Sequence, residues 1–212
     1  MRSLIAMSLL AAGAGLSACA TAPQISPPIS TSMPAGTPAQ DSPLGFVSFC
    51  LRFNDQCTYD SNMPSVVTLD SKTWTLANQV NASMNADIWP EHDKRHYDLA
   101  EYWTIPTDGF GDCKDYALAK RKELAEKGLP LKALRVAIVM TPNKELHAVL
   151  TIATDKGDYA LDNLTDKILP WSATDYRWIA RQDSQKSWNW VSFNNGSTRI
   201  AMLETETGSQ LE

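Results

Sequence analysis

The chain has 212 residues, a formal net charge of −5 and 43% hydrophobic residues. That length and apolar content suit one domain with a hydrophobic core of its own. The net charge is acidic and the basic residues are scattered along the chain, so nothing indicates a nucleic-acid-binding protein.

The first 18 residues are typical of an export signal. One positive charge precedes an apolar stretch, LIAMSLLAAGAGL, which is too short to span a bilayer comfortably. The quartet LSAC that ends at Cys19 resembles a bacterial lipobox, in which the cysteine is acylated and becomes the mature N-terminus. Ordinary cleavage after Ala20 or Ala22 is the alternative, because both residues close small-x-small patterns. Either route predicts an exported, periplasmic protein, and the lipobox adds a lipid anchor to a bacterial membrane.

The composition changes twice along the chain. Residues 19–43 are rich in Pro, Ser, Thr and Ala and almost lack large apolar side chains, so we expect a flexible tether. From residue 44 the apolar content recovers, and we expect one domain over residues 44–205. Residues 206–212 are then a short tail.

The remaining cysteines differ in their surroundings. Cys50 and Cys57, in FCLRFNDQC, lie seven positions apart near the start of the domain. In an oxidising compartment two close cysteines predict a disulfide, whereas a zinc pair needs two further ligands that are not evident nearby. Cys113 is left without a partner. An unpaired cysteine in an exported protein is either deeply buried or kept for its reactivity.

Cys113 stands at the predicted start of a helix, in GDCKDYALAKRKELAEKGLP. Asp112 is a favourable N-cap, Asp115 falls at the third helical position, and Gly128 ends the helix. The unpaired N–H groups at a helix start stabilise a thiolate, and they are also suited to hold an oxyanion. The alternative is a small side chain packed under the first turn.

Two of the three histidines lie in a charged stretch, and the third lies in an apolar one. His92 and His96 are four residues apart, a spacing that fits a metal site on a helix, but their surroundings favour a solvated loop or turn. His147 belongs to a segment that predicts three strands, over 133–140, 146–153 and 158–162. It is a candidate general base, and a core histidine with satisfied hydrogen bonds is the alternative.

A hairpin register connects His147 with Asp162. If the two later strands turn around residues 155–157, Ala153 pairs near Asp158 and position 149 faces Asp162. His147 then lies diagonally across from Asp162 on the same face, about 7–8 Å away at Cα, within reach of both side chains. An aspartate that orients a histidine, which activates Cys113, has the logic of a catalytic triad.

These motifs together resemble the bacterial transglutaminase-like cysteine peptidase family. The resemblance covers about residues 45–192 and rests on FCLRFNDQC, PEHDKRHYDLAEYWTIPTDGFGDC, the Cys113 helix, LRVAIV, HAVLTI and YALDNLTDKILPW. It implies an α+β fold with a papain-like, transglutaminase-type core, in which the nucleophile helix packs on an antiparallel sheet. The family triad maps onto Cys113, His147 and Asp162.

The resemblance also implies a substrate class and a cofactor. The best-understood members are periplasmic endoproteases that cleave large surface adhesins and are restrained by a membrane receptor. They need Ca²⁺, held by acidic residues near the nucleophile; here the candidates are Asp112 and Asp115, with Glu101 or Asp98 as a further ligand. Two carboxylates beside the sulfur disfavour a thiolate, and bound Ca²⁺ neutralises them. The alternative is a helix-capping pair. Lys114 departs from the family pattern, because many relatives have an acidic residue there.

Other functions fit the same residues. Transfer of the acyl group to an amine gives a transglutaminase, and attack on cell-wall amides gives an amidase; the triad serves all of these. A tethered binding protein without turnover is the alternative from another class. Trp103, ten residues before the cysteine, is a candidate to line the cleft or to donate its indole N–H to the oxyanion, although most tryptophans belong to the core.

Overall fold

The computed structural model describes residues 26–39 and 41–193. Its helices are α1 (Leu44–Arg52), α2 (Ser71–Asp87), α3 (Asp93–His96) and α4 (Cys113–Glu126). Its strands are β1 (Thr37–Pro38), β2 (Trp89–Pro90), β3 (Phe110–Gly111), β4 (Leu134–Met140), β5 (Leu146–Thr154), β6 (Gly157–Leu161), β7 (Leu169–Pro170), β8 (Arg177–Gln182) and β9 (Trp190–Ser192). The predicted helix after residue 112 and the three predicted strands are α4, β4, β5 and β6.

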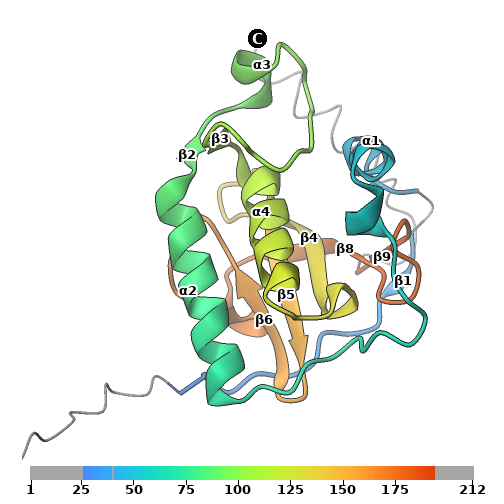
Figure 1. Ribbon diagram of the computed structural model, residues 1–212, viewed down its shortest axis with the longest axis vertical. Helices are drawn as coiled ribbons and strands as arrows, with labels where there is room; N and C mark the ends of the chain where they lie inside the picture. Colours follow the sequence, from blue (N-terminus) through green and yellow to red (C-terminus); the bar gives the residue numbers. More distant parts are fainter. Residues whose placement is uncertain (1–25, 40, 194–212) are drawn as a thin grey trace, which may run out of the picture.

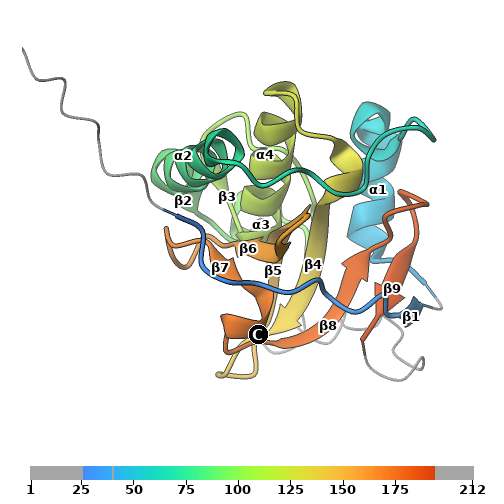
Figure 2. The same ribbon diagram turned by 90° about the horizontal axis from the view of Figure 1, so that it is seen from below.

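Seven of these strands form one antiparallel sheet in the order β1-β9-β8-β4-β5-β6-β7. Helices α2 and α4 lie side by side over β4, β5 and β6, and α1 lies toward the β9 end (Figure 1). Seen from below, all three helices are on the same face of the sheet (Figure 2). The prediction of an α+β fold with the nucleophile helix packed on an antiparallel sheet is confirmed.

Strand β4 shows how the sheet separates two apolar layers. Val136 and Ile138 belong to the main core, together with apolar side chains of α1, α2 and α4. Ala137 and Val139 belong to a smaller cluster with Met33. Because successive side chains of a strand point to opposite faces, the first pair faces the helices and the second pair faces away.

The segment before the domain corrects one prediction. Residues 26–39 are not a flexible tether: Asp158 donates its backbone N–H to Thr31 O at 3.0 Å, and Met33 N–H donates to Asp158 Oδ2 at 3.2 Å. Strand β1 pairs with β9 at the edge of the sheet. The physical reason is that Met33 supplies an apolar side chain to the sheet face that the helices leave uncovered. Cys19 and the export signal lie outside the described residues.

Helix α1 is joined to the turn that follows it. The sequence analysis proposed no helix here, but it did propose the Cys50–Cys57 disulfide, and the structure has this bond with a Cα–Cα distance of 5.4 Å. Both cysteines are buried beside Phe46 and Phe49. Within residues 26–39 and 41–193, no helix combines the length and the apolar character needed to cross a membrane.

Candidate active site

Cys113 is the first residue of α4, as the sequence predicted. Asp112 is the N-cap and accepts a hydrogen bond from Lys114 N–H at 3.2 Å, while Asp115 Oδ2 accepts one from Asp112 N–H at 3.2 Å. Gly111 is needed just before them, because a Cβ atom there would lie 2.8 Å from Asp115 Cβ. The Cys113 side chain is half-buried, and its thiol is the free one among the cysteines of the described chain.

The hairpin of β5 and β6 brings His147 and Asp162 together. Ala153 is opposite Asp158, the register expected from the sequence. His147 Nε2 lies 2.8 Å from Asp162 Oδ1, and both side chains are buried. This contact occupies Nε2 and leaves the other ring nitrogen, Nδ1, outside it, and Cys113 is close enough to His147 to favour the protonated imidazole.

The carboxylate of Asp162 has two further donors. Leu164 N–H donates to Oδ1 at 3.0 Å, and the hydroxyl of Tyr176 donates to Oδ2 at 2.5 Å. The Tyr176 ring also stands edge-on to the His147 imidazole, with 5.8 Å between centroids. Asn85 of α2 donates to the backbone carbonyl of Asp162 at 3.0 Å. The sequence analysis missed Tyr176 and Asn85, because no local pattern ties either residue to a strand end so distant in sequence.

The electrostatics of this group favour a charged imidazole. Burial opposes the imidazolium form of His147, but the hydrogen bonds to Asp162 and Cys113 outweigh burial and raise its pKa to about 10. Burial likewise opposes ionisation of Asp162, yet its hydrogen bond and charge interaction with His147 hold its pKa below the usual value. The group therefore pairs an ionised aspartate with a protonated histidine beside the thiol.

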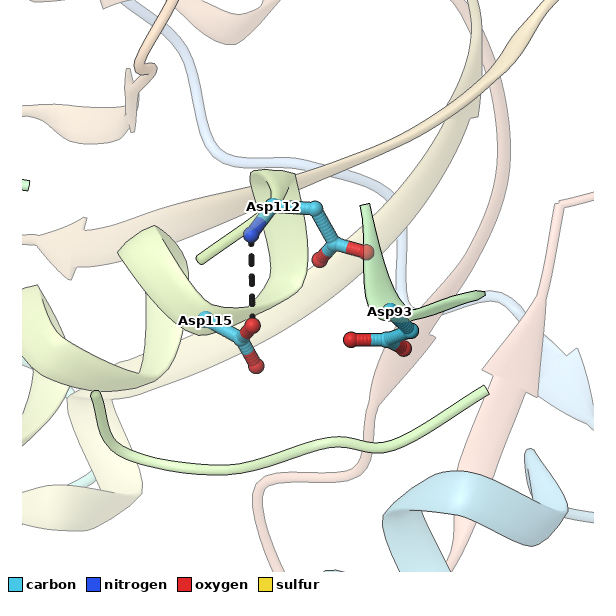
Figure 3. Close-up of side chains that lie close together, drawn as sticks. All are labelled: Asp93, Asp112 and Asp115. Carbon is cyan, nitrogen blue, oxygen red and sulfur yellow. Dashed lines mark hydrogen bonds between the residues drawn. The ribbon is translucent and has the colours of Figure 1, made fainter. Parts of the chain in front are cut away.

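A second cluster, of carboxylates, lies at the start of α4. Single carboxylate oxygens of Asp93, Asp112 and Asp115 all lie within 4.8 Å of one another, close enough to hold a metal ion. Figure 3 shows the three side chains converging, with Asp93 coming from α3, Asp115 from α4 and Asp112 from the N-cap position just before α4. Asp112 and Asp115 are the ligands that the sequence suggested, whereas Asp93 takes the place suggested for Glu101 or Asp98. Asp98 is instead exposed and pairs with Lys94 at 2.6 Å.

The side chain of Lys114 enters the same cluster. Its Nζ lies 2.7 Å from Asp93 Oδ2, forms a short ion pair with Asp112 Oδ2, and lies 3.4 Å from Glu101 Oε2. Burial opposes its charge, but the charges of Asp112 and Glu101 raise the pKa of Lys114, so the side chain is an ammonium. The Lys114 ammonium already occupies the space among these carboxylates, so their arrangement fits this side chain rather than an added divalent cation.

Asp115 is the most enclosed of the cluster's carboxylates. Its Oδ1 accepts a hydrogen bond from Thr104 N–H at 2.9 Å, and none of the side chain is exposed. Burial and the neighbouring charge of Asp112 raise its pKa to about 8, despite the opposing effect of Lys114. Asp115 therefore connects the helix start to the segment that carries Thr104.

Residues 37–198 match the family described as bacterial transglutaminase-like cysteine proteinase, BTLCP. The chain belongs to this family. Among solved structures, it is similar to Legionella pneumophila LapG treated with EGTA, at 25% identity and a TM-score of 0.50, over 66% of this chain and 79% of that one. Calcium-bound LapG is similar at 23% identity and a TM-score of 0.49, over 65% and 78% of the two chains. A comparison with curated proteins finds no match.

Trp103 and the other two histidines of this cysteine proteinase have contacts of their own. Trp103 is buried in the core, edge-on to Phe46 and Trp190, and its indole N–H has no hydrogen-bond partner. His92 is the N-cap of the short helix α3 and His96 is its last residue, with His96 Nε2 at 2.8 Å from Asp108 Oδ2. Neither histidine belongs to the carboxylate cluster.

Proposed function

We propose that this protein is an exported cysteine endopeptidase that cleaves a periplasmic or cell-surface protein through an acyl-enzyme on Cys113. The observation that carries the proposal is the hydrogen-bonded chain from Tyr176 through Asp162 to His147, together with the free thiol of Cys113 at the start of α4. Membership of a cysteine proteinase family supports peptide-bond cleavage and a protein substrate. A large surface adhesin is the substrate that the family resemblance favours.

The proposed reaction uses the thiolate–imidazolium pair. Cys113 Sγ attacks the carbonyl carbon of the scissile peptide bond, and His147 donates its Nδ1 proton to the leaving amine as the C–N bond breaks. Neutral His147 then accepts a proton from water, whose oxygen attacks the thioester and releases the acid product. Asp162 keeps the imidazole in one orientation and stabilises its charged form without exchanging protons.

The start of α4 is suited to stabilise the tetrahedral intermediate. The first N–H groups of a helix have no intrahelical partner, and the helix dipole makes this end electropositive. The Cys113 backbone N–H belongs to this first turn, next to the attacking sulfur. We therefore assign this backbone N–H as the hydrogen-bond donor to the oxyanion. It stabilises the developing negative charge without help from a further side chain.

Export and lipid anchoring are part of the same proposal. The export signal predicts transport out of the cytoplasm, LSAC predicts acylation of Cys19, and the Cys50–Cys57 disulfide is the kind of bond that persists in an oxidising compartment. The family resemblance adds an inner-membrane receptor as regulator. Mass spectrometry of the mature N-terminus tests the anchor: an unmodified N-terminus at Thr21 or Pro23 would rule it out.

Trapping of the acyl-enzyme tests the proposed chemistry. We expect a periplasmic or surface extract to leave a peptide fragment on Cys113, identifiable by mass spectrometry, and Cys113→Ala to trap nothing. His147→Ala should abolish turnover, and Asp162→Asn should leave residual activity. The exposed Lys94→Ala variant, remote from the triad group in its contacts, is the control. Capture of amines in place of hydrolysis would point to acyl transfer, and turnover by Cys113→Ala would remove the proposal.

A further inference from the structure

The ammonium group of Lys114 has three N–H donors, and three carboxylates surround it. Asp93 Oδ2 lies 2.7 Å away, Asp112 Oδ2 forms the short contact, and Glu101 Oε2 lies 3.4 Å away. The Lys114 side chain is only 6% exposed. A lysine so enclosed is rare unless its charge is paired, and here the pairing is complete.

The same cluster fastens the segment that leads to the nucleophile. Asp93 Oδ2 also accepts a hydrogen bond from Tyr102 N–H at 2.5 Å, and Asp115 accepts backbone N–H groups of Thr104 and Asp112. Asp93 and Asp115 therefore hold the chain between α3 and α4 at two points. The charges of Asp93 and Asp112 repel each other, and the Lys114 ammonium, which contacts both carboxylates, relieves this repulsion.

We propose that the Lys114 ammonium is the permanent cation of this cluster, so that the proteinase orders the approach to Cys113 without a divalent metal ion. The inference rests on the proposed function only for the role of the neighbouring cysteine. The position of the ammonium, and its consequence for metal binding, stand on the contacts of Lys114 alone.

A tethered ammonium differs from a bound ion in one measurable way. It cannot dissociate, so its contribution does not depend on the concentration of free metal, whereas a bound ion stabilises the fold in proportion to the logarithm of its concentration. A divalent ion that enters this cluster must also displace the ammonium from its carboxylates. The ammonium would then be a buried charge without its partners, next to a second cation. Replacing Lys114 with glutamate removes that obstacle and supplies a further oxygen ligand.

Calcium titration of the full chain tests the proposal. We expect calorimetry to detect no Ca²⁺ binding to the parent protein tighter than about 1 mM, and its melting temperature to be the same in EGTA and in Ca²⁺. Lys114→Glu should bind Ca²⁺ and should melt at least about 5 °C higher with Ca²⁺ than in EGTA. The matched control is Lys122→Glu, which makes the same charge change on the solvent side of α4 and should gain no calcium response.

The outcomes separate the two proposals. Stoichiometric Ca²⁺ binding to the parent protein that raises its melting temperature would overturn the role of Lys114, whatever the activity. If Lys114→Glu does not fold, Lys114→Met takes its place: it should melt below the parent in EGTA and recover part of the loss in Ca²⁺, and no loss at all would also overturn the inference. The alkylation rate of Cys113 by iodoacetamide should be the same in EGTA and in Ca²⁺ for the parent. If the parent protein shows these calcium results but has no peptidase activity, only the proposed function is contradicted.

Discussion

Replacing Tyr176 with phenylalanine removes one hydroxyl beside the triad and leaves the aromatic ring in place. In the parent protein that hydroxyl donates to Asp162 Oδ2 at 2.5 Å, while the other carboxylate oxygen is served by His147 and Leu164. Asp162 is only 4% exposed, so water does not readily replace the lost donor. Tyr176→Phe therefore leaves a buried carboxylate oxygen without its hydrogen bond.

The size of the effect follows from the charge on Asp162. A hydrogen bond to an ionised group contributes about 1.5–3 kcal/mol, which corresponds to a factor of about 10 to 150 when it is fully expressed in one equilibrium. The loss weakens the anion that stabilises the His147 imidazolium, and with it the thiolate–imidazolium pair. We expect the equilibrium constant that favours this pair to fall by about tenfold, because part of the loss is absorbed by rotation of the carboxylate.

The rate of Cys113 alkylation by iodoacetamide measures this population without a known substrate. The rate for Tyr176→Phe should be lower than for the parent near neutral pH, by up to about tenfold, and should approach the parent rate at alkaline pH. Tyr159→Phe is the control, because its hydroxyl donates to Pro28 O at 2.8 Å, far from the triad in its contacts. This control should lose stability and keep the parent alkylation rate.

One result would refute the reasoning about Tyr176. If Tyr176→Phe lowers the melting temperature as Tyr159→Phe does, yet alkylates at the parent rate across the whole pH range, the hydroxyl serves only the fold. The pH profile makes this distinction, since a general loss of stability does not change the pH at which a thiol reacts.

Three further measurements test other parts of the structure. Reduction of the Cys50–Cys57 bond should lower the melting temperature by about 5–10 °C, because the closed loop contributes about 2.5 kcal/mol to stability through the entropy of the unfolded chain. Thiol counting on the oxidised domain should find one free thiol, and two would contradict the pairing. Met33→Ala should lower the free energy of unfolding by about 2 kcal/mol, because Met33 packs on the sheet face that the helices leave uncovered. An unchanged midpoint in denaturant would show that this segment behaves as a flexible tether. The pKa of His147 is about 10 in the folded chain against 6.5 unfolded, so its stabilising contribution is complete below pH 6.5 and is lost as the pH rises toward 10. The free energy of unfolding should fall over that range more steeply for the parent than for His147→Gln, and parallel curves would show that His147 is not the titrating group.

The sequence predicted the local elements around the site because their determinants are local. Asp112, Asp115 and Gly128 mark the ends of α4 by capping chemistry that acts within one helical turn. Turn residues between β5 and β6 set the hairpin register, and the two-residue alternation of side chains then brings His147 to Asp162.

Helix α2 escaped the sequence analysis because its buried side chains are partly polar. Asn81 has no exposed surface and donates to the backbone carbonyls of Thr165 and Asp166, and Asn85 does the same for Asp162. From the sequence alone, asparagines spaced along a helix indicate a solvent-exposed face, because their hydrogen-bond partners are not known. Those partners lie about eighty positions away along the chain.

The sequence by itself determined the candidate triad and the cysteine pair, because each depends on capping, alternation or short spacing, and its resemblance to the family implied the fold class. Only the tertiary structure decided that Tyr176 completes the surroundings of Asp162, that Asp93 joins the carboxylates of α4, and that Lys114 lies between them. These contacts join segments that no turn or periodicity connects. Their formation depends on how α3, α4 and the sheet pack, since burial removes the water that otherwise separates such charges.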